Sequence, residues 1–340
     1  MKKNRILSAV VVGLIVSIFS ASGSCQQKLA QSGLQFLSVV SDARGAAMAD
    51  AMTSLQAGSS SLFFNPAGMT GLNGIIDVSG STNKWIADIT HNTFGLELNP
   101  ANGRYGVLGF SFQYVNYGDF YGTIIDANSP QGYDDLGIYR LASYAAGVGY
   151  AKQLTEQFSV GGQIKWVHQD LGSSIIPLVT SNDTTKQTIS NTMSPLAFDF
   201  GTQFKTGIKS LVFGMSVRNF SKQVQYVNDG FQAPLVFSLG ISLNVLDLAS
   251  ELPFNQSMLV SVDASHYTDH PEEIKVGLDY RLLDVLSLRA GYSSTNAVND
   301  EGRGFSYGLG LTKFGFAVDY AYTPFGDFGN VQRFTVRFSM

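Results

Sequence analysis

Alternation of apolar with small or polar residues is the feature of this sequence that most limits how it can fold. Near the C-terminus, for example, Phe316, Val318 and Tyr320 alternate with Ala317 and Asp319. Successive side chains of a β-strand point to opposite faces, so a period of two predicts strands with two different faces. Because the pattern recurs from about residue 74 onward, we expect an all-β fold.

Counting the alternating segments predicts about fourteen strands. Many of them have the roughly 9–11 residues that a tilted strand needs to cross a bilayer. The predicted strands are 74–81, 90–98, 105–115, 138–151, 157–169, 194–206, 210–219, 234–246, 257–268, 273–283, 285–294, 304–312, 314–323 and 331–340.

The connections between these strands differ in length at the two ends of the predicted sheet. One end carries the long connections 116–137 and 170–193, whereas the other has mostly tight turns, such as 207–209 and residue 313. Short periplasmic turns, longer outer loops and an even number of strands are typical of outer-membrane barrels. A soluble sandwich has no reason to sort its loops in this way.

Charged residues of the predicted strands fall on the Gly/Ser face and avoid the Phe/Leu/Val face. A charge on a lipid-facing wall near mid-membrane costs about 2–4 kcal/mol, so this sorting indicates that the apolar face touches lipid. Charged residues make up only 14% of the chain, against about 25% in an average soluble domain. We therefore predict a transmembrane antiparallel β-barrel over residues 74–340. The charges on the Gly/Ser face are Lys165, Asp199, Lys205, Arg218, Asp263, Asp279, Arg281, Arg289, Asp319, Arg333 and Arg337.

The first 25 residues have the pattern of a removable secretion signal. A basic stretch is followed by the apolar run 7–19 and by the small residues 20–24. Removing it takes away three of the 22 basic residues, which leaves 19 against 26 acidic residues, a net charge of −7. That charge gives no support for nucleic-acid binding. Cys25, the only cysteine, is either an acylated lipoprotein cysteine or an incidental thiol; Ser22 stands where lipoproteins usually carry leucine.

Residues 26–73 precede the first strand and do not alternate. In the stretch SSLFFNPAGM, Pro66 restricts Asn65 to extended conformations and Gly68 permits unusual backbone geometry. Because the lumen of a fourteen-stranded barrel is too wide for wall side chains alone to fill, we predict that this segment is a hatch that plugs the barrel from the periplasmic side. The alternative is that Asn65-Pro66 only turns the chain into the first strand.

Several motifs resemble those of a known family. FLSVVSDARGAAMADAM (residues 36–52) followed by SSLFFNPAGM (60–69) is similar to the N-terminal region of the PorV/PorQ outer-membrane barrels, which share a fold with FadL-like transporters. The resemblance continues in GVGYAKQLTEQFSVGGQIKWV (147–167), FGMSVRNF (213–220), LRAGY (288–292) and DYAYTPFGDFGNVQRF (319–334). It implies a role in type IX secretion, in which members help to export cargo or attach it to the cell surface.

The resemblance also implies where such a protein acts and what it contacts. The expected location is the outer membrane of a Gram-negative-type bacterium, with lipid and either secretion-system components or secreted cargo as partners. A FadL-like conduit for hydrophobic molecules is the alternative, with a hydrophobic ligand or lipid held beside a movable gate. The residues expected to form the hatch or gate are Asp42, Arg44, Phe64, Asn65, Pro66, Gly68 and Met69.

The remaining candidate sites lie in the lumen and at the outer rim. The charges predicted to line the lumen, either as internal pairs or as a polar path, are Asp199 with Lys205, Asp279 with Arg281 and Asp319 with Arg333. Pro324, Phe325 and Phe328 would contact a partner at the outer rim or belong to an aromatic girdle. Of the four histidines only His266 and His270 are close in sequence. They fall at a strand end and in a loop, where a spacing of four residues does not bring two side chains together to bind one metal ion. With no nucleophile-elbow, dinucleotide or zinc-protease motif, we expect no enzyme activity, no metal site and no cofactor.

Overall fold

The computed structural model describes residues 32–126, 129–180, 183–225, 230–248, 254–294, 304–326 and 329–340. The signal sequence, Cys25 and Phe328 lie outside the described residues. None of the helices described is both long and apolar enough to span a membrane.

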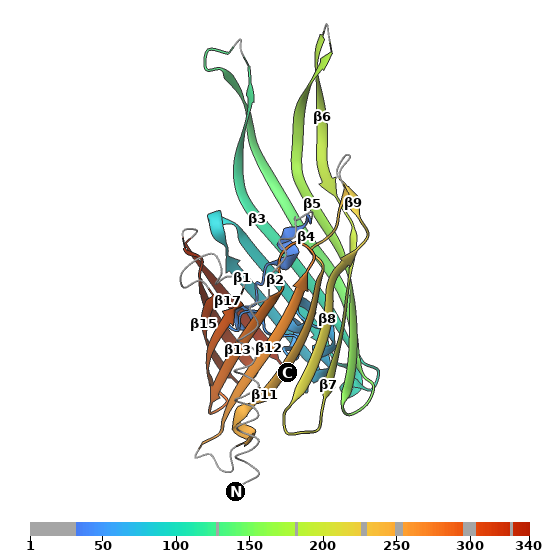
Figure 1. Ribbon diagram of the computed structural model, residues 1–340, viewed down its shortest axis with the longest axis vertical. Helices are drawn as coiled ribbons and strands as arrows, with labels where there is room; N and C mark the ends of the chain where they lie inside the picture. The colour runs from blue at the N-terminus through green and yellow to red at the C-terminus, as the bar shows by residue number, and fades with distance from the viewer. Residues whose placement is uncertain are drawn as a thin grey trace.

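Within the described residues, fourteen antiparallel strands form a closed ring (Figure 1). The pairing of β4 with β5 closes it, which confirms the predicted barrel. No ring strand is left with an unpaired edge along the wall, as a sheet in lipid requires. The ring strands are β1 (Ile76–Lys84), β2 (Thr90–Leu98), β3 (Val107–Ile125), β4 (Tyr133–Gln153), β5 (Phe158–Thr180), β7 (Leu196–Lys205), β8 (Val212–Ser221), β11 (Val236–Asn244), β12 (Gln256–Tyr267), β13 (Glu273–Leu282), β14 (Leu286–Ser293), β15 (Phe305–Lys313), β16 (Phe316–Pro324) and β17 (Asn330–Ser339).

Two predicted outer loops are largely strands, so the expectation of loops over 116–137 and 170–193 is wrong. The hairpin β3–β4 continues to the pair Ile125–Tyr133, and β5 continues by pairing with β6 (Asp183–Met193). Register shifts next to Asn116 and Asp170 mark the level at which both hairpins leave the ring, and such bulges bend a strand. Figure 1 shows the two hairpins standing beyond the rim; we call this the outer end.

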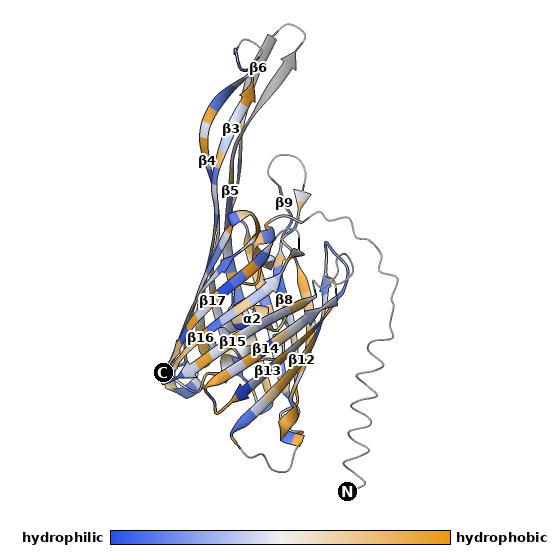
Figure 2. Ribbon diagram, turned by 90° about the vertical axis from the view of Figure 1, so that its left-hand side faces the viewer, coloured by the Kyte–Doolittle hydropathy of each residue, from blue (hydrophilic) through white to orange (hydrophobic). Residues whose placement is uncertain are grey.

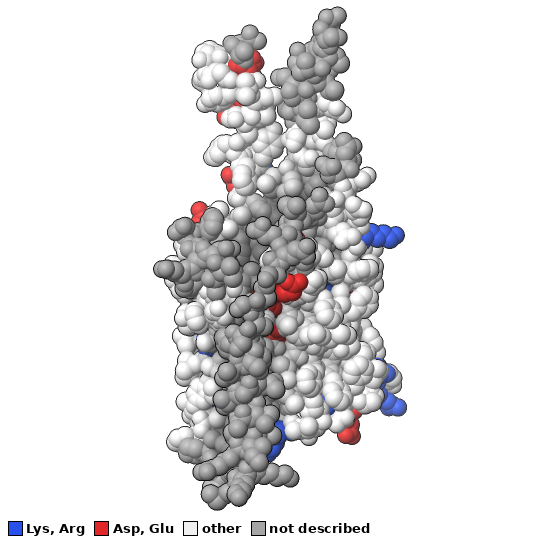
Figure 3. Space-filling model, in the orientation of Figure 1, with Lys and Arg blue, Asp and Glu red and all other residues white. Residues whose placement is uncertain are grey.

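The opposite, near end carries the short turns and the C-terminus (Figures 1 and 2). The apolar face of the wall points outward, as predicted: Ile164, Phe200 and Leu309 are each more than half exposed. Figure 2 shows the alternation of apolar and polar residues along the wall strands, and Figure 3 shows large uncharged areas on the described wall. A short hairpin of β9 (Val224–Gln225) and β10 (Gly230–Phe231) belongs to the connection between β8 and β11.

Residues 32–73 lie inside the ring, and we call them the inner segment. Four short helices make up much of it, and they lie close to the strands of the ring. These helices are η1 (Gln35–Ser38), α2 (Ala43–Ala47), η2 (Gly58–Phe63) and η3 (Pro66–Gly71); the connections of the wall add η4 (Ile86–Asp88), η5 (Pro100–Gly103) and η6 (Val245–Leu248).

The inner segment runs along the whole lumen, beginning at the outer end. Ser32 forms a bridge with Gln232 and donates a hydrogen bond to the carboxylate of Asp269, and both partners lie in outer connections. At the near end, the side chain of Asn99 donates to the carbonyls of Leu72 and Gly74 at 2.9 and 3.0 Å. Hydrogen bonds thus hold the first described residue of the segment beside the outer loops and its last residues at the near end; entry from the periplasmic side stays a prediction.

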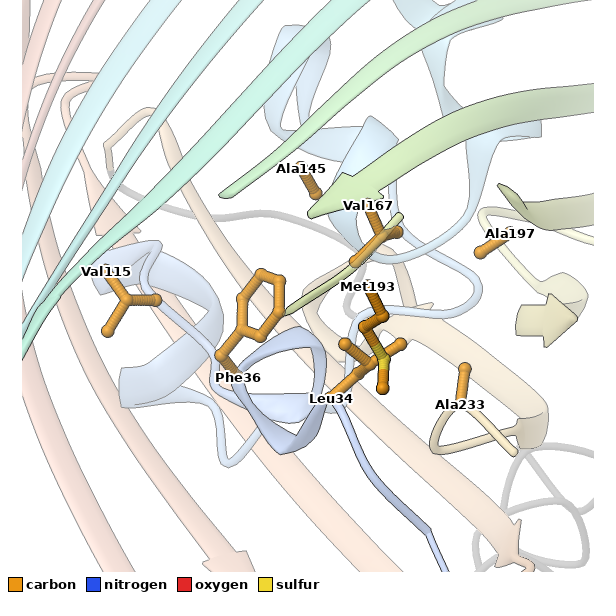
Figure 4. Packing of buried hydrophobic residues seen from close by; sticks show 8 residues of the cluster. All are labelled: Leu34, Phe36, Val115, Ala145, Val167, Met193, Ala197 and Ala233. Carbon is orange, nitrogen blue, oxygen red and sulfur yellow. The ribbon is translucent and has the colours of Figure 1, made fainter. Parts of the chain in front are cut away.

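An apolar cluster holds the beginning of the inner segment under the outer rim (Figure 4). Leu34 and Phe36 insert between wall residues and are 2% and 4% exposed. Inward-facing residues are mostly polar elsewhere, so this cluster is a local apolar anchor and not a continuous core. Its other members, from the ring strands, the end of β6 and the connection before β11, are Val115, Ala145, Val167, Met193, Ala197 and Ala233.

Candidate functional site: the filled lumen

The side chain of Asn65 attaches the inner segment to the wall through hydrogen bonds. Its Oδ1 accepts a hydrogen bond from the backbone of Ala67 at 3.1 Å and so caps η3. Its Nδ2 donates to the carbonyl of Thr53 at 2.7 Å and to the wall carbonyls of Thr202 (3.1 Å) and Met215 (3.4 Å). Asn65 thus joins two parts of the inner segment to β7 and β8, which is more than a turn before the first strand requires.

Glycines on the inner face of the wall let the inner segment approach its backbone. A Cβ added at Gly161, for example, would lie 2.5 Å from the backbone nitrogen of Ala67, closer than the 3.0 Å that real Cβ atoms respect. We call this set the glycine belt; its members sit on β2 to β5, on β7 and β8, and on β13 to β15. It comprises Gly95, Gly109, Gly149, Gly161, Gly201, Gly214, Gly277, Gly291 and Gly308.

The other predicted hatch residues also lie in this packed region. Asp42 caps α2 by accepting from the Gly45 nitrogen at 2.7 Å and receives the Ser60 hydroxyl at 2.9 Å. Phe64 is 4% exposed and Met69 is fully buried. Gly68 packs against Ser61 and Leu55, where a Cβ would come within 3.0 Å. The structure therefore brings all of these residues together; that they act as a gate stays a prediction.

Two charged residues connect the inner segment to the wall. Arg44 forms an ion pair with Asp279 on β13 at 3.2 Å. Asp50 pairs with Arg218 on β8 at 3.3 Å and with Lys275 on β13 at 2.8 Å. Burial raises the pKa of Asp50, but Lys275 and Arg218 outweigh it and hold the net pKa below its usual 3.8. Burial lowers the pKa of Arg44 to about 10, partly opposed by Asp279, so both groups are charged at neutral pH.

The lumen charges predicted from the sequence face inward, but their partners differ from those expected. Asp199 pairs with Lys165 at 2.8 Å, not with Lys205. Asp279 and Asp319 share Arg289, at 3.2 and 2.5 Å. Two of the predicted pairs join residues along one strand, and side chains on neighbouring strands or on the inner segment come closer. Asp319 instead meets Arg289 across Gly310 of the intervening strand. In the described part of the chain, Lys205, Arg281 and Arg333 form no ion pair.

Four of the cavities among the described residues lie beside the inner segment or against the wall next to it. The outer one has a volume of about 460 Å³ and lies among Val40, Trp85, Tyr267, Lys275 and Arg333. A middle cavity of about 30 Å³ and a near-end cavity of about 170 Å³, which Lys205 lines, are separated from it by the inner segment. The fourth, about 220 Å³, opens on the wall between β5, β7 and β8 beside Gly161 and Gly201.

At the outer rim, Phe325 packs edge-on against Trp85 with ring centroids 5.0 Å apart, and Pro324 ends β16. Both aromatic rings line the outer cavity, so this part of the predicted rim faces inward. His270 stacks on Tyr267 at 3.8 Å. No group of three or more metal-ligating side chains occurs among the residues that the structure describes.

Sequence reasoning missed several residues that bind the inner segment or form ion pairs inside the lumen. The sequence shows that Lys165, Arg218 and Arg289 are charges on the Gly/Ser face. The alternation of residues does not predict which carboxylates they pair with. The backbone nitrogen of Thr53 donates to Asp263 at 2.9 Å, and Gln203 donates to the Leu55 carbonyl at 2.9 Å. The one available signal was the excess of glycine on the inner face, since the chain contains 36 glycines.

A closed ring with an apolar outside and a polar, internally occupied lumen defines a transmembrane β-barrel of the outer-membrane type. Residues 59–336 match the family of the type IX secretion system membrane protein PorP/SprF, and the chain belongs to this family. The predicted link to type IX secretion is confirmed at this level, whereas the matched family is PorP/SprF and the narrower PorV/PorQ assignment is not confirmed.

Solved structures of the same fold include three aromatic-hydrocarbon transporters. The Ralstonia pickettii toluene transporter TbuX is 11% identical (TM-score 0.56; 88% of this chain and 98% of that one are covered). The monoaromatic hydrocarbon channel CymD is 12% identical (TM-score 0.54; 88% of this chain and 97% of that one are covered). The Pseudomonas putida toluene transporter TodX is also 12% identical (TM-score 0.53; 92% of this chain and 98% of that one are covered). At these identities the likeness establishes the fold alone. No curated protein sequence matches the chain.

Proposed function

We propose that this protein is a non-enzymatic outer-membrane component of type IX secretion. It stays closed by its inner segment and engages secretion-system components or secreted cargo from its outer face. The observation that carries the proposal, beside the family membership, is the lumen: ion pairs and hydrogen bonds fill it from Arg44 to Met69. A polar, occupied lumen suits a docking protein better than a conduit for apolar solutes.

The two long hairpins favour the outer face as the binding surface. Tyr121, Ile125 and Ile138 on β3–β4 are 77%, 90% and 52% exposed, although this part of the hairpin stands beyond the lipid-facing ring (Figure 1). Beyond Asn116, β3 no longer pairs with β2, and above Ala142, β4 no longer pairs with β5. Exposed apolar side chains on free strand edges are typical of surfaces that pair with another chain. The PorV/PorQ-type role, helping to export cargo or attach it to the surface, is the form of the proposal that the sequence motifs favour.

Deletion of the gene tests the proposal. Secreted proteins with a C-terminal sorting domain should accumulate in the periplasm, and reintroducing the wild-type gene should restore export. A variant with Tyr121, Ile125 and Ile138 changed to Ser should insert normally, because these side chains lie beyond the membrane, yet export less cargo. Normal export in the deletion strain would contradict the secretion role; full export by the triple variant would contradict only the hairpin surface.

A second candidate function is passage of hydrophobic molecules, and one observation favours it. The 220 Å³ groove on the wall lies where Gly161 and Gly201 leave only Asn65 and Pro66 behind the sheet. Movement of the segment from Asn65 to Met69 would connect this groove with the lumen. Uptake of a labelled alkane or toluene by cells with and without the protein tests this role, and equal uptake would contradict it.

A further inference from the structure

The outer cavity has the size and composition of a small-molecule site. Its volume of about 460 Å³ falls within the roughly 300–1,000 Å³ of typical ligand pockets. Helices η1 and α2 form its inner side, and the ends of β12 to β17 form its outer side. Neither the predicted gate residues around Asn65 nor the exposed hairpins contribute to it.

Among the described residues, Arg333 is the cation of this cavity that forms no ion pair. It is 5% exposed, donates from Nε to the Val40 carbonyl at 2.8 Å and from Nη1 to the Thr323 hydroxyl at 2.9 Å. A guanidinium has five N–H donors, and these two bonds engage two of them. Among the described residues no carboxylate pairs with Arg333, whereas Lys275 in the same cavity pairs with Asp50 and Glu273. Buried charges are normally paired, so the described surroundings of Arg333 suit an anionic ligand in the cavity.

Aromatic rings fix the position of the guanidinium and provide apolar walls. The Arg333 guanidinium lies 5.5 Å from the centre of the Trp85 ring, and Phe325 holds that ring in place. The stacked pair Tyr267 and His270 forms a second aromatic wall. A ligand here would meet one cationic fork and several apolar faces.

The charged residues that line the outer cavity favour a ligand with a single negative charge. Asp50 and Glu273 line the same cavity and would repel a dianion such as phosphate more strongly than a monoanion. A planar carboxylate also fits the guanidinium fork. We propose that the outer cavity binds a carboxylate carried on an aromatic or aliphatic group, with Arg333 holding the carboxylate. Such a group occurs at the C-terminus of a polypeptide and in a fatty acid; the site does not depend on the secretion role.

Tryptophan fluorescence can test the site directly. The chain has two tryptophans, and Trp166 lies on the outer wall, 44% exposed, so Trp166→Phe leaves Trp85 as the only reporter. In nanodiscs, acetyl-phenylalanine and its amide form one probe pair, and octanoate and octanamide form the other. At least one acid should bind tenfold or more tighter than its amide. Preference for acetyl-phenylalanine would identify a polypeptide-like ligand, and preference for octanoate an aliphatic one.

Variants assign the effect to Arg333. Arg333→Gln should abolish the preference for the acid, and Arg333→Lys, which keeps the charge without the fork, should weaken it at least threefold even if the Gln variant folds poorly. Arg337→Gln is the matched control, because Arg337 lies on the same strand but contacts Ala57 and Asp77 near the other end. Equal binding of acid and amide, an unchanged preference in both Arg333 variants, or equally tight binding of inorganic phosphate would overturn the proposal.

Discussion

Gly161→Ala should loosen the inner segment without harming the wall. The new Cβ would lie 2.5 Å from the Ala67 nitrogen and 2.5 Å from the Pro66 carbonyl carbon, so η3 must retreat by nearly 1 Å. Backbone atoms stand opposite, and no side-chain rotation can relieve the overlap. Overpacking of this kind costs about 1–3 kcal/mol.

The retreat of η3 also strains the hydrogen bonds from Asn65 to Thr202 and Met215. Each such bond contributes about 0.5–1.5 kcal/mol. Together the two effects weaken docking of the segment by roughly 2–6 kcal/mol, which at about 1.4 kcal/mol per tenfold increases the undocked population by roughly 30-fold to 20,000-fold.

Gly162→Ala is the matched control, since it lies on the same strand and faces outward. Its added Cβ would be 3.4 Å from the nearest atom, the Asp199 carbonyl oxygen, an ordinary contact. In planar bilayers, Gly161→Ala should show channel openings and Gly162→Ala should remain as closed as the wild type. Hydrogen exchange should be faster in residues 53–72 of the first variant only. If the two variants match in conductance and exchange, the glycine belt does not hold the segment in place and the reasoning fails.

Three further predictions concern charge and topology. Asp50→Asn should destabilise the protein by about 3–5 kcal/mol and lower its thermal midpoint, because it leaves Lys275 and Arg218 buried beside a neutral group. Asp119→Asn removes only an exposed ion pair with Arg140 and should change the thermal midpoint little. Equal shifts of the midpoint in the two variants would refute this. Since the folded pKa of Asp50 is lowered, its stabilisation is present above its unfolded value near 3.8 and is lost as pH falls below that, so wild-type stability should drop more steeply in acid than that of Asp50→Asn. In a Cys25→Ser background, Gln35→Cys should react with an impermeant maleimide on intact cells and Thr155→Cys should not; the reverse would show that the outer and near ends are assigned wrongly.

The wall could be predicted from the sequence because lipid acts on each strand separately. Phe200 must face hydrocarbon and Asp199 must not, whatever the neighbouring strands are, so the period of two appears in every segment. Outside the membrane that constraint ends. Residues such as Thr123 and Ile124 on β3 show no strict alternation, so the pattern predicts loops where the long hairpins lie.

The contents of the lumen could be predicted only in part. The stretch around Asn65 and Pro66 showed a specific turn, and the Gly/Ser face showed where charges would point. Which charges meet depends on strand register and on the path of the inner segment, so the bonds of Asp50 to Lys275 and Arg218 join residues 225 and 168 positions apart. The same applies to Ser32, whose position at the outer end follows from contacts with two distant connections.

The ion pairs also limit how the barrel could open. Withdrawal of the inner segment would separate Arg44 from Asp279 and Asp50 from two cations, and would expose glycine-lined wall that packs against nothing else. Water entering the lumen would compensate part of this loss, but several contacts must break together. The closed state therefore predominates unless a ligand binds the open state more tightly, and moving such an equilibrium from 1:99 to 99:1 needs about 5.5 kcal/mol of differential binding. Because Ser32 of the segment bonds to the outer connections, a partner docking there is placed to contribute that energy. Any opening of this barrel is accordingly expected to depend on its partner.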